Sequence, residues 1–174
     1  MPNKDDQQKE YTMIHSRQLL AFLTILITVP AAAELPTRHI LPVALAKEMA
    51  EVTQAHCLGM GYNVSVHVVD SAGDTLVAYR GEETGVHTFV LSYRKAYTAM
   101  TFDRPSSVFR ERIENGDIGP QMQLMLPDMA GQQGGLPIHV GEEVIGGIGA
   151  AGGGSGSDSI CAQAGIDAVA DRLN

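Results

Sequence analysis

Hydrophobic and polar positions follow helical spacing and then strand spacing through the first half of the chain. Apolar residues recur three and four apart over residues 43–58, which predicts an amphipathic helix. Residues 63–70 alternate between apolar and polar side chains, which is typical of a strand. The turn-forming residues 71–74 follow, so we expect residues 75–80 to return as an antiparallel strand.

The second half of the chain predicts two helices, a second hairpin and a closing helix. These elements are expected over residues 86–101, 106–113, 136–140, 144–150 and 157–173. Ser106 is expected to cap the short helix, and Ser157 or Asp158 the closing helix. Consecutive hairpins favour an antiparallel sheet with helices packed on its faces, so the sequence predicts an α+β domain.

Three glycines lie inside the last predicted strand, at Gly146, Gly147 and Gly149. Glycine weakens a strand, and its presence there indicates a bulge or the close approach of another body to the backbone. We therefore expect something flat, or a second subunit, to lie against this part of the sheet.

Three segments together resemble a known family. They are VSVHVVDSAGDTLVAYR at residues 64–80, SYRKAYTAMTF at residues 92–102, and GGLPIHVGEEVIGGIGAAG with DSICAQAGIDAV at residues 134–169. Their order and spacing are similar to those of the GlcG/HbpS-like haem-binding (haem-degrading) family, which is related to the C-terminal domain of PduO-type proteins. The resemblance implies a profilin-like αβα layout, haem as the cofactor, and assembly into dimers or larger rings.

The N-terminal region predicts export. Arg17 precedes the apolar run LLAFLTILITV, and three alanines follow it at residues 31–33. This pattern is typical of a secretory signal peptide cleaved near Ala33, with an uncleaved membrane anchor as the alternative. We therefore expect residues 1–33 to be an upstream segment and signal peptide, with translation starting at Met1 or Met13. Residues 34–174 are expected to form a single domain that is periplasmic or secreted. The mature chain is expected to have no stable membrane span.

Net charge limits the class of partner, and the cysteine content allows one disulfide. The net charge of the 174-residue chain is -8, which argues against nucleic acid or an anionic membrane as the main partner. Cys57 and Cys161 are the two cysteines. In an oxidising compartment they can pair, and two buried thiols are the alternative.

Candidate iron ligands are argued from the histidines one by one. His87 follows a glycine loop at the first turn of a predicted helix and is the leading candidate for the axial ligand, since haem iron takes a neutral imidazole. A simple exposed loop histidine is the alternative for His87. His39 lies in a segment stiffened by two prolines, and it is expected to reach the site of a neighbouring subunit as a second ligand. A mobile tail is the alternative for His39. His56 adjoins Cys57 at a helix end and is a weaker candidate. His67 is expected to face a helix or an interface, and His139 to be exposed.

Other side chains are candidates for contact with the macrocycle. Arg94 and Arg104, with Lys95, are expected to pair with two propionates, because guanidinium groups suit carboxylates. A solvated basic face is the alternative. Tyr93 and Tyr97, one helical turn apart, are expected to flank a flat ring or else to serve packing. The acidic residues Glu82, Glu83, Glu111 and Glu114 are interpreted as solvated faces, with weak binding of released iron or calcium as the alternative.

The sequence therefore predicts an exported haem-binding protein that forms a homo-oligomer and acts in haem uptake, storage, sensing or degradation. No catalytic residue is evident, so any degradation would be driven by the bound iron. Two alternatives remain open: a binding module for another small ligand (a corrinoid, a flavin or an organic acid), or an oligomeric accessory protein without haem.

Overall fold

The computed structural model describes residues 35–154 and 156–173. The predicted signal peptide, its cleavage near Ala33 and the two possible start positions lie outside the described residues. A compact unit begins at Arg38. The division of the chain into residues 1–33 and 34–174 therefore stays a prediction.

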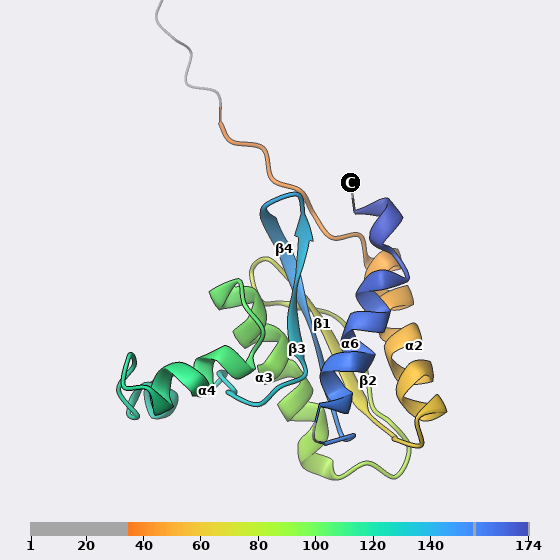
Figure 1. The fold of residues 1–174 in the computed structure, drawn as a ribbon. Coiled ribbons are helices and arrows are strands. Elements are labelled where there is room, and N and C mark those ends of the chain that lie inside the picture. Colours follow the sequence, from red (N-terminus) through yellow and green to blue (C-terminus); the bar gives the residue numbers. More distant parts are fainter. Residues whose placement is uncertain (1–34, 155, 174) are drawn as a thin grey trace, which may run out of the picture. The chain divides into compact units, whose positions relative to one another are not determined.

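A four-stranded antiparallel sheet with helices on both faces makes up the compact unit (Figure 1). The elements are α2 (Val43–Gly59), β1 (Ser65–Asp70), β2 (Thr75–Tyr79), α3 (Val86–Phe102), α4 (Ser107–Glu114), α5 (Met122–Met125), β3 (Gly135–Val140), β4 (Glu143–Ala151), α6 (Ser157–Asp167) and a 3-10 turn (Ala170–Arg172). The strand order is β2-β1-β4-β3. This is the predicted α+β class with a profilin-like αβα arrangement.

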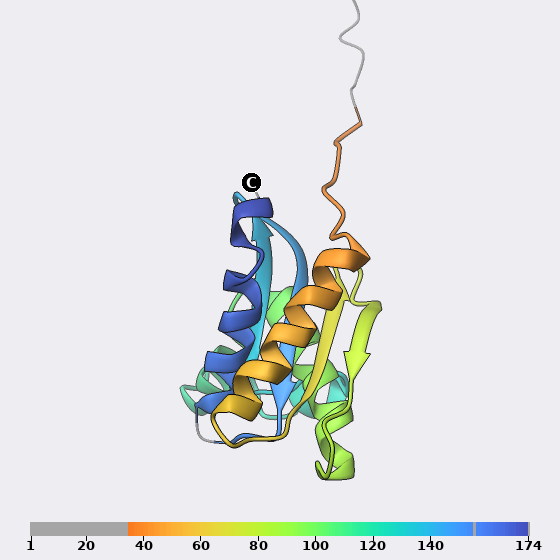
Figure 2. The same cartoon turned by 90° about the vertical axis from the view of Figure 1, so that its right-hand side faces the viewer.

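Helices α2 and α6 lie side by side on one face of the sheet, and α3 crosses the other face (Figure 2). The main core fills the space under α2 and α6. Its largest buried side chains include Met49, Val66, Ile138, Ile145 and Ile148. Strand β1 alternates as predicted, but both of its faces are covered, so nearly every one of its residues is buried.

Helix α3 packs directly against the glycines of β4. A Cβ atom at Gly149 would lie 2.6 Å from the backbone nitrogen of Ala96, and one at Gly147 would lie 3.0 Å from the Cβ of Met100. The first distance is too short for any side chain, and a Cβ atom at Gly147 would also clash with the carbonyl oxygen of Ala96. Glycine at both positions therefore allows α3 to rest directly on the strand. The prediction of a close neighbour is confirmed, but for these two glycines the neighbour is a helix of the same chain, rather than a flat ligand or a second subunit.

A disulfide joins Cys57 of α2 to Cys161 of α6, with 5.5 Å between their Cα atoms. Both residues are fully buried. The alternative of two separate thiols is therefore wrong. The bond fastens the last turn of α2 to the first half of α6.

Three details of the helix ends differ from the sequence prediction. Helix α6 ends at Asp167, and a 3-10 turn replaces its expected final turns. Among the described residues, no side chain caps α6 or α4. Ser106 Oγ instead donates to the carbonyl of Gln132, and the Asp158 carboxylate takes part in a buried ion pair. Both polar side chains have partners in neighbouring elements, since Ser106 binds Gln132 of the loop before β3 and Asp158 binds Lys95 of α3.

Candidate functional site

A pocket of about 920 Å³ opens between the first half of α3, helix α4 and the loop that follows β4. Its walls also include residues 61–63 and residues 131–133. Its volume lies near the upper end of the roughly 300–1,000 Å³ that is usual for small-molecule and cofactor sites. The pocket therefore has room for a large ligand.

One face of α3 forms a wall of this pocket. His87, Leu91 and Lys95 are spaced four residues apart, and all three line it. Residues at this spacing share one helix face. The pocket thus receives, in order along α3, an imidazole, an aliphatic side chain and a buried ammonium group.

His87 has a defined place at the start of α3. A Cβ atom at Gly85 would lie only 2.7 Å from Cε1 of the His87 ring, so the ring occupies space that a glycine leaves free. The side chain is exposed toward the pocket and has no hydrogen-bonding partner among the described residues. Its ring nitrogens are therefore available to a ligand.

Lys95 and Asp158 form a buried ion pair at the inner end of the pocket. Lys95 Nζ lies 2.7 Å from Asp158 Oδ2 and donates to the carbonyl of Ala150 at 2.9 Å. Asp158 Oδ1 accepts a hydrogen bond from the Gly153 backbone nitrogen. Burial lowers the pKa of Lys95, and the neighbouring Asp158 carboxylate opposes that effect. The pair ties α3 to β4 and to the start of α6.

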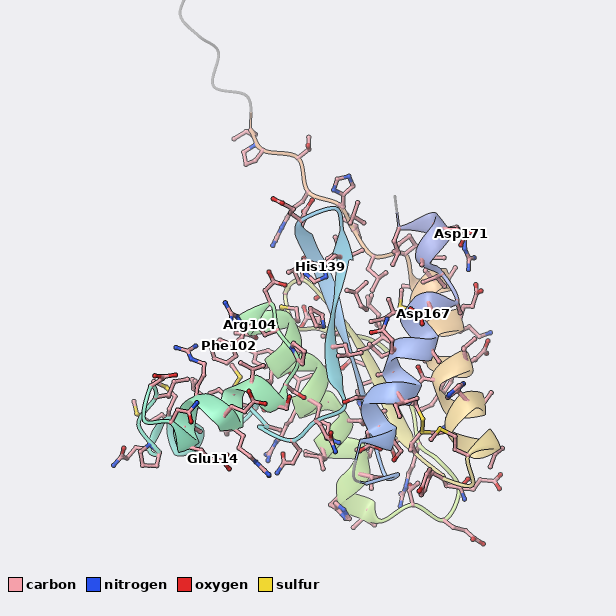
Figure 3. The ribbon with its side chains drawn as sticks, viewed as in Figure 1. Phe102, Arg104, Glu114, His139, Asp167 and Asp171 are labelled. Atoms are coloured by element: carbon pink, nitrogen blue, oxygen red, sulfur yellow. A yellow bond between two sulfur atoms is a disulfide. The ribbon has the colours of Figure 1, made fainter. Side chains whose placement is uncertain are left out.

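Charged side chains of α4 complete the outer wall. Arg110, Glu111 and Glu114 line the pocket, and Glu83 lines it from the loop before α3. Figure 3 labels Glu114 on one side of α4 and Arg104 on the other. These glutamates are exposed, as expected of solvated faces, but they also border the pocket. The sequence alone did not indicate this, because the walls of the pocket come from residues that are distant in sequence.

The structure places His39 at the opposite end of β4 from His87. The His39 backbone nitrogen donates to Glu143 Oε1, and its Nδ1 lies 2.5 Å from Glu143 Oε2. The hydrogen bond from His39 lowers the pKa of Glu143. Glu143 begins β4, whereas His87 shares its pocket with residues that follow the strand. A single chain therefore does not bring these two predicted ligands together.

The predicted tyrosines lie on the other side of α3. The rings of Tyr93 and Tyr97 are 5.8 Å apart, and Tyr93 also packs edge-on against His67. Burial raises the pKa of Tyr93, with a smaller contribution from Asp128. Neither tyrosine is among the residues that line the large pocket. Helical geometry explains this, since positions 93 and 97 project away from the face of His87 and Leu91.

The basic residues that were predicted to pair with the propionates do not lie together at one site. Lys95 is buried in its ion pair, so the alternative of a solvated basic face is wrong for this residue. The Nε atom of Arg94 is buried without a hydrogen-bonding partner in the described part of the chain. Arg104 lines a small cavity with Phe102 and Phe109, apart from the large pocket.

The remaining histidines have structural neighbours. His67 is buried and its Nδ1 lies 2.8 Å from Ser92 Oγ, as predicted for a strand histidine that faces a helix. Burial lowers the pKa of His67 to about 4. His139 pairs with Asp103 at the surface, and His56 lines a shallow groove beside α6.

Among residues 35–154 and 156–173, no group of three or more His, Cys, Asp or Glu side chains is placed to hold a metal ion. Within the same residues, no helix has the length and apolar character needed to cross a bilayer. A binding pocket with one available histidine is thus the main chemical feature.

The fold and the pocket define a small αβα ligand-binding domain. Residues 41–167 match the family described as "Haem degrading protein HbpS-like". The match covers most of the chain, and this protein belongs to that family.

Individual relatives agree with this assignment. The chain is 30% identical over 135 residues to the uncharacterized 15.0 kDa protein of the dhaT-dhaS intergenic region of Citrobacter freundii, covering 74% of this chain and 92% of that protein. The crystal structure of HbpS is 31% identical, with a TM-score of 0.72 and coverage of 78% and 94%. The structure of a PduOC:heme complex shares the fold at 21% identity, with a TM-score of 0.70 and coverage of 75% and 95%.

Proposed function

We propose that this protein binds haem in the large pocket, with His87 as the iron ligand. The observation that carries the proposal is the position of His87, whose unpaired ring faces the cavity at the start of α3. Haem iron is commonly held by a neutral histidine nitrogen. The family match, and the haem complex of a protein with the same fold, support the choice of ligand.

The residues around the pocket fit a flat macrocycle. Leu91 and Tyr62 provide apolar surface on two walls. Among the described residues, a Cβ atom at Gly61 or at Gly154 would meet nothing within 4 Å, so these glycines leave space at the rim of the pocket. The cavity therefore combines a ligand atom, apolar contact and room at its rim.

Bound haem would supply iron redox chemistry, while the chain's residues bind and orient the group. His87 would hold the iron, and Leu91 would contact the ring. The described residues around the cavity form no triad of nucleophile, base and orienting group. The role is accordingly haem uptake, storage, sensing or degradation, with any degradation driven by the iron.

Export is the second part of the proposal. The apolar run after Arg17 supports it, and so does the disulfide between Cys57 and Cys161, since such bonds persist in oxidising compartments. Expression of the full chain followed by N-terminal sequencing of the exported form tests this. We expect a new terminus at Glu34. An intact N-terminus on a membrane-attached protein would support the uncleaved anchor instead.

Assembly into a homo-oligomer is the third part. Val86 and Val90, one turn apart on α3, are 78% and 51% exposed, and the half-buried Tyr93 lies on the same side of the helix. These three residues form an apolar stripe on α3. We assign this stripe to contact with a second copy of the chain. Only from another copy would His39 reach iron at His87. Sedimentation of the wild type and of Val90→Glu tests the assignment, and equal masses for both would contradict it.

A haemin titration of residues 34–174, followed by Soret absorbance, tests the central proposal. We expect a sharp band that saturates at a fixed ratio, and weaker binding in His87→Ala. His139→Ala is the matched control, because His139 lies outside the pocket. A featureless response that does not saturate in any of the proteins would overturn haem binding and favour another small ligand or an accessory role.

A further inference from the structure

We infer that Arg110 binds a carboxylate of the pocket's ligand, so that the pocket selects a macrocycle that carries an acidic arm. This inference rests on the proposed haem function and assigns a specificity-determining residue to the same pocket. It also differs from the sequence prediction, which gave the propionate contacts to Arg94 and Arg104.

The first observation is the availability of the Arg110 charge. Arg110 lines the pocket from α4 and is exposed, and it forms no ion pair within residues 35–154 and 156–173. A guanidinium group presents a planar fork of donors that matches the two oxygens of a carboxylate. The side chain is therefore free to bind an acidic group that enters the cavity.

The second observation is the fixed base of this side chain. A Cβ atom at Gly131 would lie 2.8 Å from the Cβ of Arg110 and 3.0 Å from its backbone nitrogen. The loop before β3 thus packs directly on the backbone of α4 at this position. This contact places the base of the Arg110 side chain beside Gly131, which lines the same pocket.

The other cations near the pocket cannot fill this role. Lys95 lines the cavity, but its ammonium group already binds Asp158 and the carbonyl of Ala150. Arg112, two residues after Arg110 on α4, lines the small cavity beside Phe109 instead. In the described part of the chain, Arg110 is the pocket-lining cation that lacks an acidic partner.

The glutamates at the rim of the pocket also affect which ligand the pocket selects. Glu114 lies one helical turn after Arg110, and Glu83 and Glu111 also line the pocket. These carboxylates repel a small, wholly anionic molecule. They are compatible with a ligand whose cationic centre lies apart from its acidic arms, as in ferric haem with its propionates. Glu114 would also compete with the ligand for Arg110, because opposite charges four residues apart on a helix attract.

The test compares haemin with its dimethyl ester, in which both carboxylates are masked. The full chain is titrated with each compound as wild type, Arg110→Ala, Glu114→Gln and the control Arg112→Ala. We expect Arg110→Ala to weaken haemin binding by about tenfold or more, as for loss of a hydrogen bond between charged groups, and to leave binding of the ester unchanged. Glu114→Gln is expected to strengthen haemin binding, and Arg112→Ala to match the wild type.

The outcomes separate this inference from the proposed function. Equal haemin affinity in the wild type and Arg110→Ala would overturn the role of Arg110 while haem binding stands. An equal loss for haemin and the ester would also overturn it, because a merely structural effect does not depend on the carboxylates. Absence of saturable binding of either compound to the wild type would overturn both.

Discussion

The ammonium group of Lys95 and the carboxylate of Asp158 lie 2.7 Å apart, with side-chain exposures of only 3% and 6%. Lys95 comes from the middle of α3, and Asp158 from the first turn of α6. Because these helices cover opposite faces of the sheet, the ion pair joins the two outer layers around the end of β4. It also forms the inner end of the candidate pocket.

Asp158→Asn is expected to lower the free energy of unfolding by about 3–5 kcal/mol, because it leaves the Lys95 ammonium buried without its counter-charge. Urea denaturation measures this. The double variant Lys95→Met, Asp158→Leu should cost less than the sum of the two single changes. The exposed pair of Arg172 and Glu48 is the control, and Glu48→Gln should lower the free energy of unfolding far less, because water screens an exposed ion pair. A loss at Asp158 no larger than the loss at Glu48 would contradict the account.

Loss of the disulfide should destabilise the domain without unfolding its sheet. Cys57 and Cys161 are 104 residues apart in sequence, so the bond restricts most of the unfolded chain. Replacing both by serine is expected to cost about 2–5 kcal/mol. Thermal unfolding of the variant and of the wild type, with intact mass to verify the bond, measures the effect. Equal unfolding free energies would show that the bond contributes little.

Gly149→Ala should disrupt the contact between α3 and β4. The new methyl group would lie 2.6 Å from the Ala96 nitrogen, where only backbone atoms can yield. Overpacking of this kind costs about 1–3 kcal/mol, and more where the backbone must move. Gly59→Ala is the matched control, because nothing lies within 4 Å of its added Cβ atom. Similar chemical denaturation midpoints for Gly149→Ala and Gly59→Ala would contradict the close approach.

Protonation of His67 should oppose folding at low pH. Burial lowers its pKa from 6.5 to about 4, so between these values the unfolded chain binds more protons than the folded protein. Stability from this residue is therefore present above about pH 6.5 and falls as the pH drops toward 4, by up to roughly 3 kcal/mol. His67→Gln removes the titration, so the difference in unfolding free energy between wild type and variant should narrow at low pH. A constant difference from pH 7 to pH 4 would count against this assignment.

Much of the fold follows from local patterns. Strand β1 alternates Val66 and Val68 against His67, and each hairpin turn contains a glycine, so element order and class were predictable. The exact ends were less so. Asp158 and Ser106 are good capping residues by type, but tertiary partners take their side chains instead.

The candidate site was only partly predictable, for a geometric reason. His87 was selected as a candidate because it follows a glycine loop at a helix start, and the structure places it in the wall of the pocket. Its neighbours on the same helix face, Leu91 and Lys95, could have been found from their spacing of four residues. Arg110 comes from a different helix, and nothing local in the sequence shows that α4 borders the cavity that His87 faces. The separation of His39 from His87 likewise depends on the sheet topology.

Rescue of a His87→Gly variant by free imidazole tests the central claim most directly. If His87 holds the iron, the variant loses the Soret spectrum of the wild-type haem complex, and added imidazole restores it by filling the vacated position. Gly85→Ala offers a related check, since its Cβ would displace the His87 ring. A wild-type spectrum in His87→Gly without imidazole would contradict the claim that His87 is the ligand.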